Sequence, residues 1–216
     1  MTPAELIAGD HTALVLQEIQ NGVVGEASVF PALAAAAAAV GVVPNAARLA
    51  VAARAAGVPV VHATAENLPG GFGVNRNARL FAAARKAGAA NAPGSDSVAP
   101  VAELVGDGDL VLPRYHGLSP MTGGALDSLL RNAGVRTIVV AGVSLNVAIP
   151  NLVFDAVNRA YQVVVVSDAV AGVPLDYGTD VLSRTLALLA TLATTDDIVA
   201  AWTTSARDAE RGLARE

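Results

Sequence analysis

The sequence predicts an α/β protein in which one parallel sheet is covered by helices on both faces. Short apolar runs bounded by turn residues alternate along the chain with helical stretches, which is the pattern of repeated strand–helix units. The runs at 136–142 and 162–168 are continuously apolar rather than alternating. Strands that are buried on both faces have this pattern.

Five strands and five helices follow from this alternation. The strand candidates are residues 12–17, 58–64, 109–113, 136–142 and 162–168. The helix candidates are residues 44–56, 77–87, 124–133, 147–160 and 177–192. A further helix begins near Asp196 and Asp197, whose carboxylates suit the positive end of a helix dipole. We expect Trp202 to anchor this helix in the core.

Proline and glycine mark the ends of these helices. Pro44 and Pro150 fall in first turns, where a missing N–H costs no hydrogen bond. Gly57 and Gly134 follow last turns, where glycine commonly ends a helix. These positions support the proposed helix boundaries.

We expect a single domain over residues 1–216. The Gly-, Pro- and Asn-rich stretches 67–75 and 88–100 are predicted loops that are too short to separate domains. The first of them is a candidate lid over a site. The chain is 53% hydrophobic and 15% charged, so it has enough apolar material for a large core and is not a disordered chain.

Composition excludes several classes of function. The net charge is −5 and basic residues are not clustered, so no nucleic-acid partner is expected, because phosphate binding needs grouped cations. The chain has no cysteine, which excludes disulfides, thiolate metal sites and a cysteine nucleophile. Its three histidines lack metal-ligand spacing, and its glycine-rich stretch lacks the context of a dinucleotide-binding loop. We therefore expect neither a metal nor a cofactor.

No membrane attachment is expected either. The Ala-rich run 32–43 is shorter than the ~20 apolar residues of a spanning helix, and a packed helix with a loop explains it better. Residues 1–10 lack the apolar segment of a signal peptide. The expected location is the cytoplasm.

Polar side chains follow the first strand candidate. Ligands bind beyond the carboxyl ends of parallel strands, so Glu18, Gln20 and Asn21 are candidate site residues. Desolvation favours the protonated form of a carboxyl group, and a glutamate held among apolar neighbours would suit a general acid. A solvated turn, with Asn21 capping a helix, explains the same residues.

Arg114, Tyr115 and His116 follow the third strand candidate. Together they offer an anion clamp, a phenolic donor and a group that titrates near neutrality. A structural histidine and a salt-bridged arginine are the alternative.

Ser144, Asn146 and Val147 follow the fourth strand candidate and lead into a helix. Backbone N–H groups at a helix N-terminus can bind an anion or an oxyanion. Ser144 is not favoured as a nucleophile, because the G-x-S-x-G elbow requires glycine where this chain has Asn146.

Three stretches in this order resemble the isochorismatase-like family, also called the cysteine hydrolase superfamily. ALVLQEIQN at 13–21 resembles its first block, a strand followed by an acidic residue and Gln-Asn. SPMTGGALDSLL at 119–130 resembles the second, and 137–172 resembles the third, with its Gly-Val turn and Asp-Ala pairs. The resemblance extends over about residues 12–202. It implies a three-layer Rossmann-like fold with a six-stranded parallel sheet, a cis peptide at Val143–Ser144, and a homo-oligomer, either a dimer or a tetramer.

The sequence departs from this family at its Asp, Lys and Cys triad. The Asp position holds Glu18, and the Cys position holds Ala148. The Lys position falls on Tyr115, or on Arg114 if the loop differs by one residue. Alanine offers no nucleophile, which excludes thioester catalysis.

Two interpretations remain open, both with a small-molecule substrate or ligand. The chain is either a hydrolase without a cysteine nucleophile or an inactive family member that serves as a ligand-binding or assembly protein. In the hydrolase, Glu18 is the general acid/base, Arg114 binds a substrate carboxylate, and Tyr115 or His116 orients water. A structural subunit paired with an active homologue is a third possibility.

Overall fold

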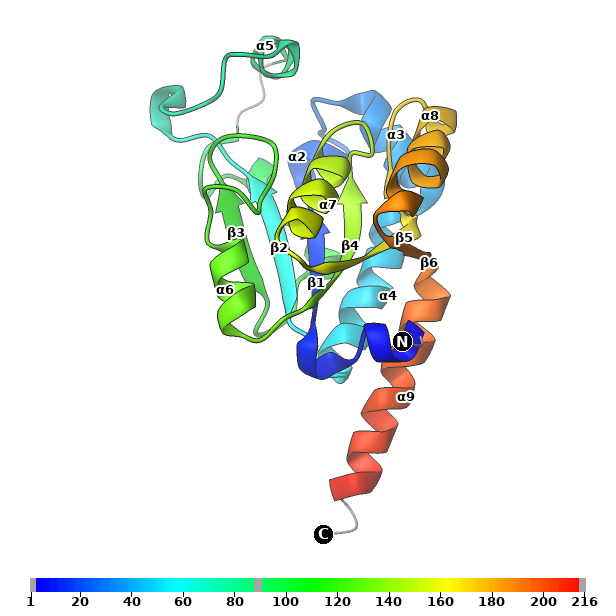
Figure 1. The fold of residues 1–216 in the computed structure, drawn as a ribbon. Helices are drawn as coiled ribbons and strands as arrows, with labels where there is room; N and C mark the ends of the chain where they lie inside the picture. Colours follow the sequence, from blue (N-terminus) through cyan, green and yellow to red (C-terminus); the bar gives the residue numbers. More distant parts are fainter. Residues whose placement is uncertain (1–2, 88–90, 214–216) are drawn as a thin grey trace.

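A parallel sheet of six strands forms the middle layer of the computed structural model, which describes residues 3–87 and 91–213 (Figure 1). Along the sheet the strands lie in the order β3-β2-β1-β4-β5-β6. They are β1 (Thr12–Gln17), β2 (Val60–Ala65), β3 (Leu110–Arg114), β4 (Thr137–Val143), β5 (Gln162–Ala171) and β6 (Thr191–Ala193). The predicted three-layer α/β fold is confirmed, and each of the five predicted strands has its counterpart.

Helices cover both faces of this sheet (Figure 1). One layer contains α3 (Pro31–Val40), α4 (Val42–Ala55) and α9 (Thr195–Leu213), and the other contains α6 (Leu126–Asn132) and α7 (Ala148–Asn158). The shorter helices are α1 (Pro3–Leu6), α2 (Asn21–Val24), α5 (Arg79–Lys86) and α8 (Leu175–Asp180).

The burial of β1 shows why its apolar run is continuous. Leu14 and Leu16 pack into the core beneath α4 and α9, whereas Ala13 and Val15 pack into the core beneath α6 and α7. Successive side chains of a strand point to opposite faces, so a strand between two helix layers needs apolar residues at every position. Trp202 is fully buried, as predicted, and its indole N–H donates to the carbonyl oxygen of Ile7 at 2.9 Å.

The start of α9 is a capping box. The Thr194 N–H donates to Asp197 Oδ2 at 2.9 Å, and the Asp197 N–H donates back to Thr194 Oγ1 at 3.2 Å. These reciprocal bonds satisfy N–H groups that have no acceptor inside the helix. Thr195 adds a contact across the layers, because its N–H donates to Asp168 Oδ1 at 2.8 Å.

The predicted helix over 177–192 is confirmed at its start, because α8 covers residues 177–180, and is wrong at its end. After α8, a π-helical turn (Val181–Thr185) and a 3-10 turn (Leu186–Leu188) lead into β6, whose residues pair in parallel with Val164–Val166 of β5. A three-residue edge strand is too short to display a strand period. Its pairing with β5 decides its conformation, and this tertiary contact is invisible in the local sequence.

The Ala-rich run forms α3, which ends at Gly41 in the left-handed conformation (φ 81°) before α4 begins. Among the described residues, no single helix is long and apolar enough to cross a membrane. α3 and α4 reach that length and composition only as a pair, and their axes are bent by 58°.

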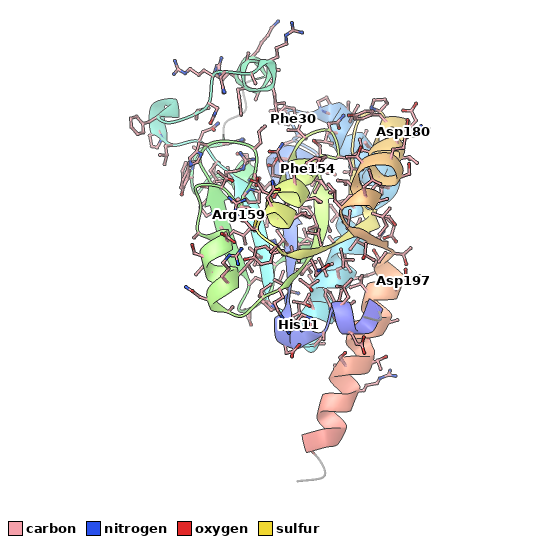
Figure 2. All side chains as sticks on the ribbon, viewed as in Figure 1. His11, Phe30, Phe154, Arg159, Asp180 and Asp197 are labelled. Atoms are coloured by element: carbon pink, nitrogen blue, oxygen red, sulfur yellow. The ribbon has the colours of Figure 1, made fainter. Side chains whose placement is uncertain are left out.

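The carboxyl ends of the strands face the top of Figure 1, and α5 stands above this edge, apart from the main body. The predicted loop 67–75 leads toward α5 and contains a short 3-10 turn, Pro69–Gly71. Of the predicted loop 88–100, residues 88–90 lie outside the described residues. Figure 2 shows Phe30 at this same edge and His11 at the opposite end of the sheet.

A buried ion cluster joins α4, β2 and the residue that precedes β3. Asp109 Oδ1 accepts from Arg54 Nε at 2.9 Å, and Asp109 Oδ2 lies 2.9 Å from His62 Nε2. The side chains of His62 and Asp109 are 2% and 4% exposed. His62 is thus a hydrogen-bonded core histidine.

Candidate functional site

A cavity of about 560 Å³ lies at the carboxyl ends of β1, β3 and β4. The sequence-predicted residues that line it are Glu18, Arg114, Tyr115, His116, Ser144, Asn146, Val147 and Ala148. The fold brings them together because parallel strands end at the same edge of the sheet. Its volume is in the range of small-molecule sites.

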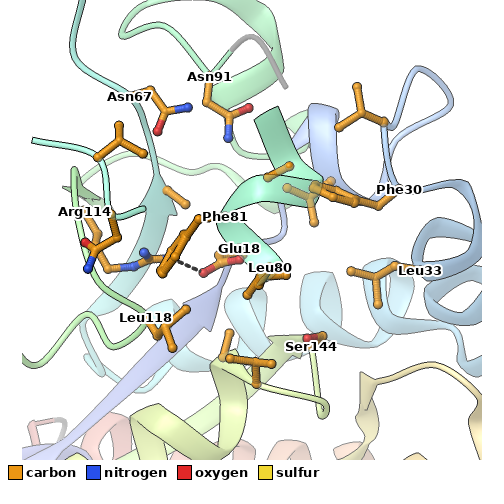
Figure 3. A pocket seen from close by; sticks show the side chains of 18 of the residues that line it. Glu18, Phe30, Leu33, Asn67, Leu80, Phe81, Asn91, Arg114, Leu118 and Ser144 are labelled. Carbon is orange, nitrogen blue, oxygen red and sulfur yellow. Dashed lines mark hydrogen bonds and ion pairs between the residues drawn. The ribbon is translucent and has the colours of Figure 1, made fainter. Parts of the chain in front are cut away.

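Glu18 and Arg114 form an ion pair inside this cavity (Figure 3). Glu18 directly follows β1 in a left-handed backbone conformation (φ 52°), and its N–H donates to the Ala63 carbonyl oxygen at 2.9 Å. Arg114 ends β3, and its Nη2 donates to Glu18 Oε1. The two side chains are 17% and 13% exposed, so the pair is largely removed from water.

Gln17 is a site residue that sequence reasoning missed. This last residue of β1 is buried, and its Nε2 donates to Glu18 Oε1 at 2.8 Å, while its own Oε1 is buried without a partner among the described residues. On the neighbouring strand β4, the residue opposite Gln17 is Gly142, where a Cβ would come within 2.1 Å of the Gln17 backbone oxygen. The sequence did contain a signal for Gln17, because it is a single amide side chain at the end of an otherwise largely apolar strand.

The Glu18 carboxylate is therefore held by one of its two oxygens. Arg114 and Gln17 both donate to Oε1, and no donor among the described side chains is bound to Oε2. The second oxygen is available to a ligand or to water. The expectation of a glutamate among apolar neighbours needs correction, because its immediate partners are a cation and an amide.

Arg114 is not a free anion clamp. Its Nη2 is bound to Glu18 and its Nη1 donates to the carbonyl oxygen of Gly117. Its buried Nε has no partner among the described residues. The two terminal nitrogens fix Glu18 and the loop that follows β3, and the binding of a substrate carboxylate by Arg114 stays a prediction.

The structure places Gln20 and Asn21 outside the lining of the cavity. Gln20 is buried, and its amide exchanges hydrogen bonds with the backbone of Ala65 while donating to the Val98 carbonyl oxygen at 2.9 Å. Asn21 Nδ2 donates to Asp96 Oδ1 at 3.1 Å. Both amides tie the end of β1 to neighbouring segments, so the expected role in substrate binding is corrected to a structural one.

The floor of the cavity is formed by the turn between β4 and α7. The peptide bond Val143–Ser144 is cis, as the family resemblance implied. Asn146 holds the segment after β5, because the Val173 N–H donates to its Oδ1 at 2.8 Å. Ala148 is the buried first residue of α7 and lines the cavity. Because α7 begins here, the positive end of its helix dipole favours negative charge at the floor.

Tyr115 and His116 lie on the loop after β3, and His116 is exposed. The Gly117 N–H donates to Asn75 Oδ1 at 2.8 Å. This bond links the loop to residues 67–75, from which Asn67, Val74 and Asn75 line the cavity. The wall opposite is apolar, and Figure 3 shows Phe30 and Leu33 on the far side of the cavity from Arg114.

Comparison with known proteins identifies the family. A profile of the Isochorismatase domain matches residues 12–197, which is most of the chain. The chain belongs to the isochorismatase family. An isochorismatase family protein from Burkholderia thailandensis is 27% identical with a TM-score of 0.71, covering 90% of this chain and 96% of that one. The N-carbamoylsarcosine amidase from Thermoplasma acidophilum is 26% identical with a TM-score of 0.66, covering 86% and 97%.

A ureidoacrylate amidohydrolase from Methylorubrum extorquens is 41% identical over 64 residues. The match covers 29% of this chain and 25% of that relative. The chain thus spans about a quarter of the length of the curated relatives it matches.

The resemblance placed Ala148 at the position of a cysteine, and a substitution at this residue tests that assignment directly. We expect the single substitution Ala148→Cys to create no amidase activity that depends on the new thiol. The positive end of α7 would favour a thiolate at this position, but the charge of Arg114 is already paired with Glu18, so we expect the thiol to be too weakly activated to attack an amide. The measurement is amide turnover before and after iodoacetamide. Strong activity that the reagent abolishes would contradict this expectation.

Proposed function

We propose that this chain is a hydrolase of small molecules that works without a cysteine nucleophile and uses Glu18 as its general acid/base. The observation that carries the proposal is that only one oxygen of the Glu18 carboxylate accepts hydrogen bonds from the described side chains. Arg114 and Gln17 donate to Oε1, and Oε2 has no donor among the described side chains although Glu18 lines the cavity. A fixed carboxylate with a free oxygen suits proton transfer.

The reaction follows from this geometry. Oε2 of Glu18 takes a proton from a bound water, and the water oxygen attacks the electrophilic carbon of the substrate. The positive end of α7 stabilises the negative charge that develops. Glu18 then returns the proton to the leaving group, so that one water is consumed and no covalent enzyme intermediate forms. A carboxyl group that serves both steps needs no thiol.

Gln17 has a positioning role in this proposal, and its replacement separates function from stability. We expect Gln17→Leu to lower turnover by roughly ten- to a hundredfold, because Glu18 loses one of the two donors that orient it. The same change removes a buried oxygen that has no partner among the described residues, so the protein should unfold at an equal or higher temperature.

Turnover and its pH profile, measured beside thermal unfolding, check the expectation for Gln17→Leu. A purely structural Gln17 would give a lower Tm, with an unchanged rate and profile in the folded fraction.

A turnover screen of the purified protein tests the function itself. Its panel contains isochorismate, nicotinamide, carbamoyl amides and simple esters. Because the chain has no cysteine, true activity must survive iodoacetamide, whereas activity from a contaminating cysteine hydrolase must not. No turnover by the folded protein would favour the inactive, ligand-binding interpretation.

A further inference from the structure

The charged groups of the cavity lie on one side of it, and the other side is lined mainly by apolar side chains. Glu18 and Arg114 lie on one side in Figure 3, with Phe81 and Leu118 beside them and Asn67 and Asn91 above. Phe30 and Leu33 lie on the other side, from the segment that opens α3. A ligand that fills both sides must carry a polar group at one end and an apolar group at the other.

The roof of the cavity extends the apolar side. Leu80, Phe81 and Ala84 of α5 line the cavity, and their i, i+1, i+4 spacing puts them on one face of the helix. No residue of α5 is buried, and Leu80 is 43% exposed. An apolar helix face that is directed into a cavity yet remains exposed is a surface that a ligand can cover.

We propose that the substrates are amphipathic, with a hydrolysable amide or ester at one end and an unbranched or aryl apolar group of about six to ten carbons at the other. The polar end lies beside Glu18 Oε2, and the apolar group lies between Phe30 and Leu33 on one side and Leu80 and Phe81 on the other. The placement of the hydrolysable end rests on the proposed function, whereas the apolar subsite rests on the cavity walls alone.

The apolar subsite predicts how binding affinity depends on the length of the ligand's alkyl chain. Each methylene that moves from water to an apolar wall should tighten binding about fourfold. A series of primary amides from acetamide to dodecanamide therefore serves as the probe, with dissociation constants measured by calorimetry. Affinity should rise steadily with chain length and level off when the cavity is full.

Two phenylalanines of the same segment provide the matched variants. Phe81 lines the cavity, whereas Phe72 is 79% exposed and is not among its lining residues. Phe81→Ser should weaken octanamide binding at least tenfold and weaken acetamide binding much less. Phe72→Ser should change neither. Because no residue of α5 is buried and Phe72 is largely exposed, both variants are expected to fold.

The outcomes separate this inference from the proposed function. Equal affinities along the amide series, or equal effects of Phe81→Ser and Phe72→Ser, would overturn the apolar subsite even if the protein hydrolysed short substrates. A steep dependence on chain length without turnover of the amides or of any compound in the screening panel would support the subsite and overturn the hydrolase proposal. The dependence of wild-type affinity on alkyl chain length tests the apolar subsite even if neither variant folds.

Discussion

Replacing Glu18 with glutamine is expected to lower turnover by about 10²–10⁴-fold while the melting temperature stays within a few degrees. The amide oxygen of the new side chain can still accept from Arg114 and Gln17, which now meet at Oε1. The amide nitrogen takes the place of Oε2 and cannot accept a proton. The change therefore removes the chemistry and keeps most of the packing. Steady-state rates and thermal unfolding of the two proteins check this.

Two further variants make the test of Glu18 specific. Glu26 is exposed, so Glu26→Gln should behave as the wild type. Glu66 is another carboxylate that lines the cavity, where its Oε1 accepts from Thr64 Oγ1 at 3.3 Å. Full activity in Glu18→Gln together with loss in Glu66→Gln would move the proton-transfer role to Glu66. Loss of folding in Glu18→Gln would show that the ion pair with Arg114 is structural.

The sheet and most of its helices could be predicted from the sequence because their signals are local. The continuous apolar runs of β4 and β5 follow from burial on both faces, and the prolines and glycines mark the helix ends. β6 escaped prediction because three residues carry no period, and only pairing with β5 makes them a strand.

The sequence could predict which strand ends form the candidate site, but it could not predict which side chains point into it. The rule that ligands bind at the carboxyl ends of parallel strands selected Glu18 and Arg114 correctly as residues of one cavity. It also selected Gln20, whose amide turns to the backbone of Ala65 and Val98 instead. Sequence position does not fix the direction of a side chain in a turn. For the same reason it could not show that Gln17, inside the strand, reaches Glu18.

The largest effect on stability is expected at Asp109, which lies outside the lining of the cavity. Asp109 is bound by Arg54, by His62 and by the Gly106 N–H. Replacing it with asparagine leaves the guanidinium of Arg54 without this counter-ion in a site where the Arg54 side chain is only 27% exposed. The loss of one partner from a buried pair costs about 3 kcal/mol, which corresponds to a fall of roughly 6–12 °C in Tm for a chain of this size.

An exposed ion pair supplies the control. Asp180 and Arg184 are 57% and 79% exposed, and a pair of this kind contributes at most about 1 kcal/mol. Asp180→Asn should therefore shift Tm by only about 2 °C. Equal shifts in the two variants would show that burial of the Arg54–Asp109 pair does not strengthen it.

The pH dependence of the Asp109 effect distinguishes the ion pair from simple packing. Burial alone would raise the pKa of Asp109, but the hydrogen bonds from Arg54, His62 and the Gly106 N–H outweigh burial and lower this pKa below its ordinary value. A carboxyl group with a lowered pKa in the folded state stabilises the protein above the ordinary pKa of about 3.9, and this stabilisation disappears as pH falls through the folded-state pKa. The Tm difference between wild type and Asp109→Asn should thus be full at about pH 6–7 and shrink below about pH 4. A difference that persists undiminished at low pH would mean that the shape of the side chain, rather than its charge, holds α4 to the edge of the sheet.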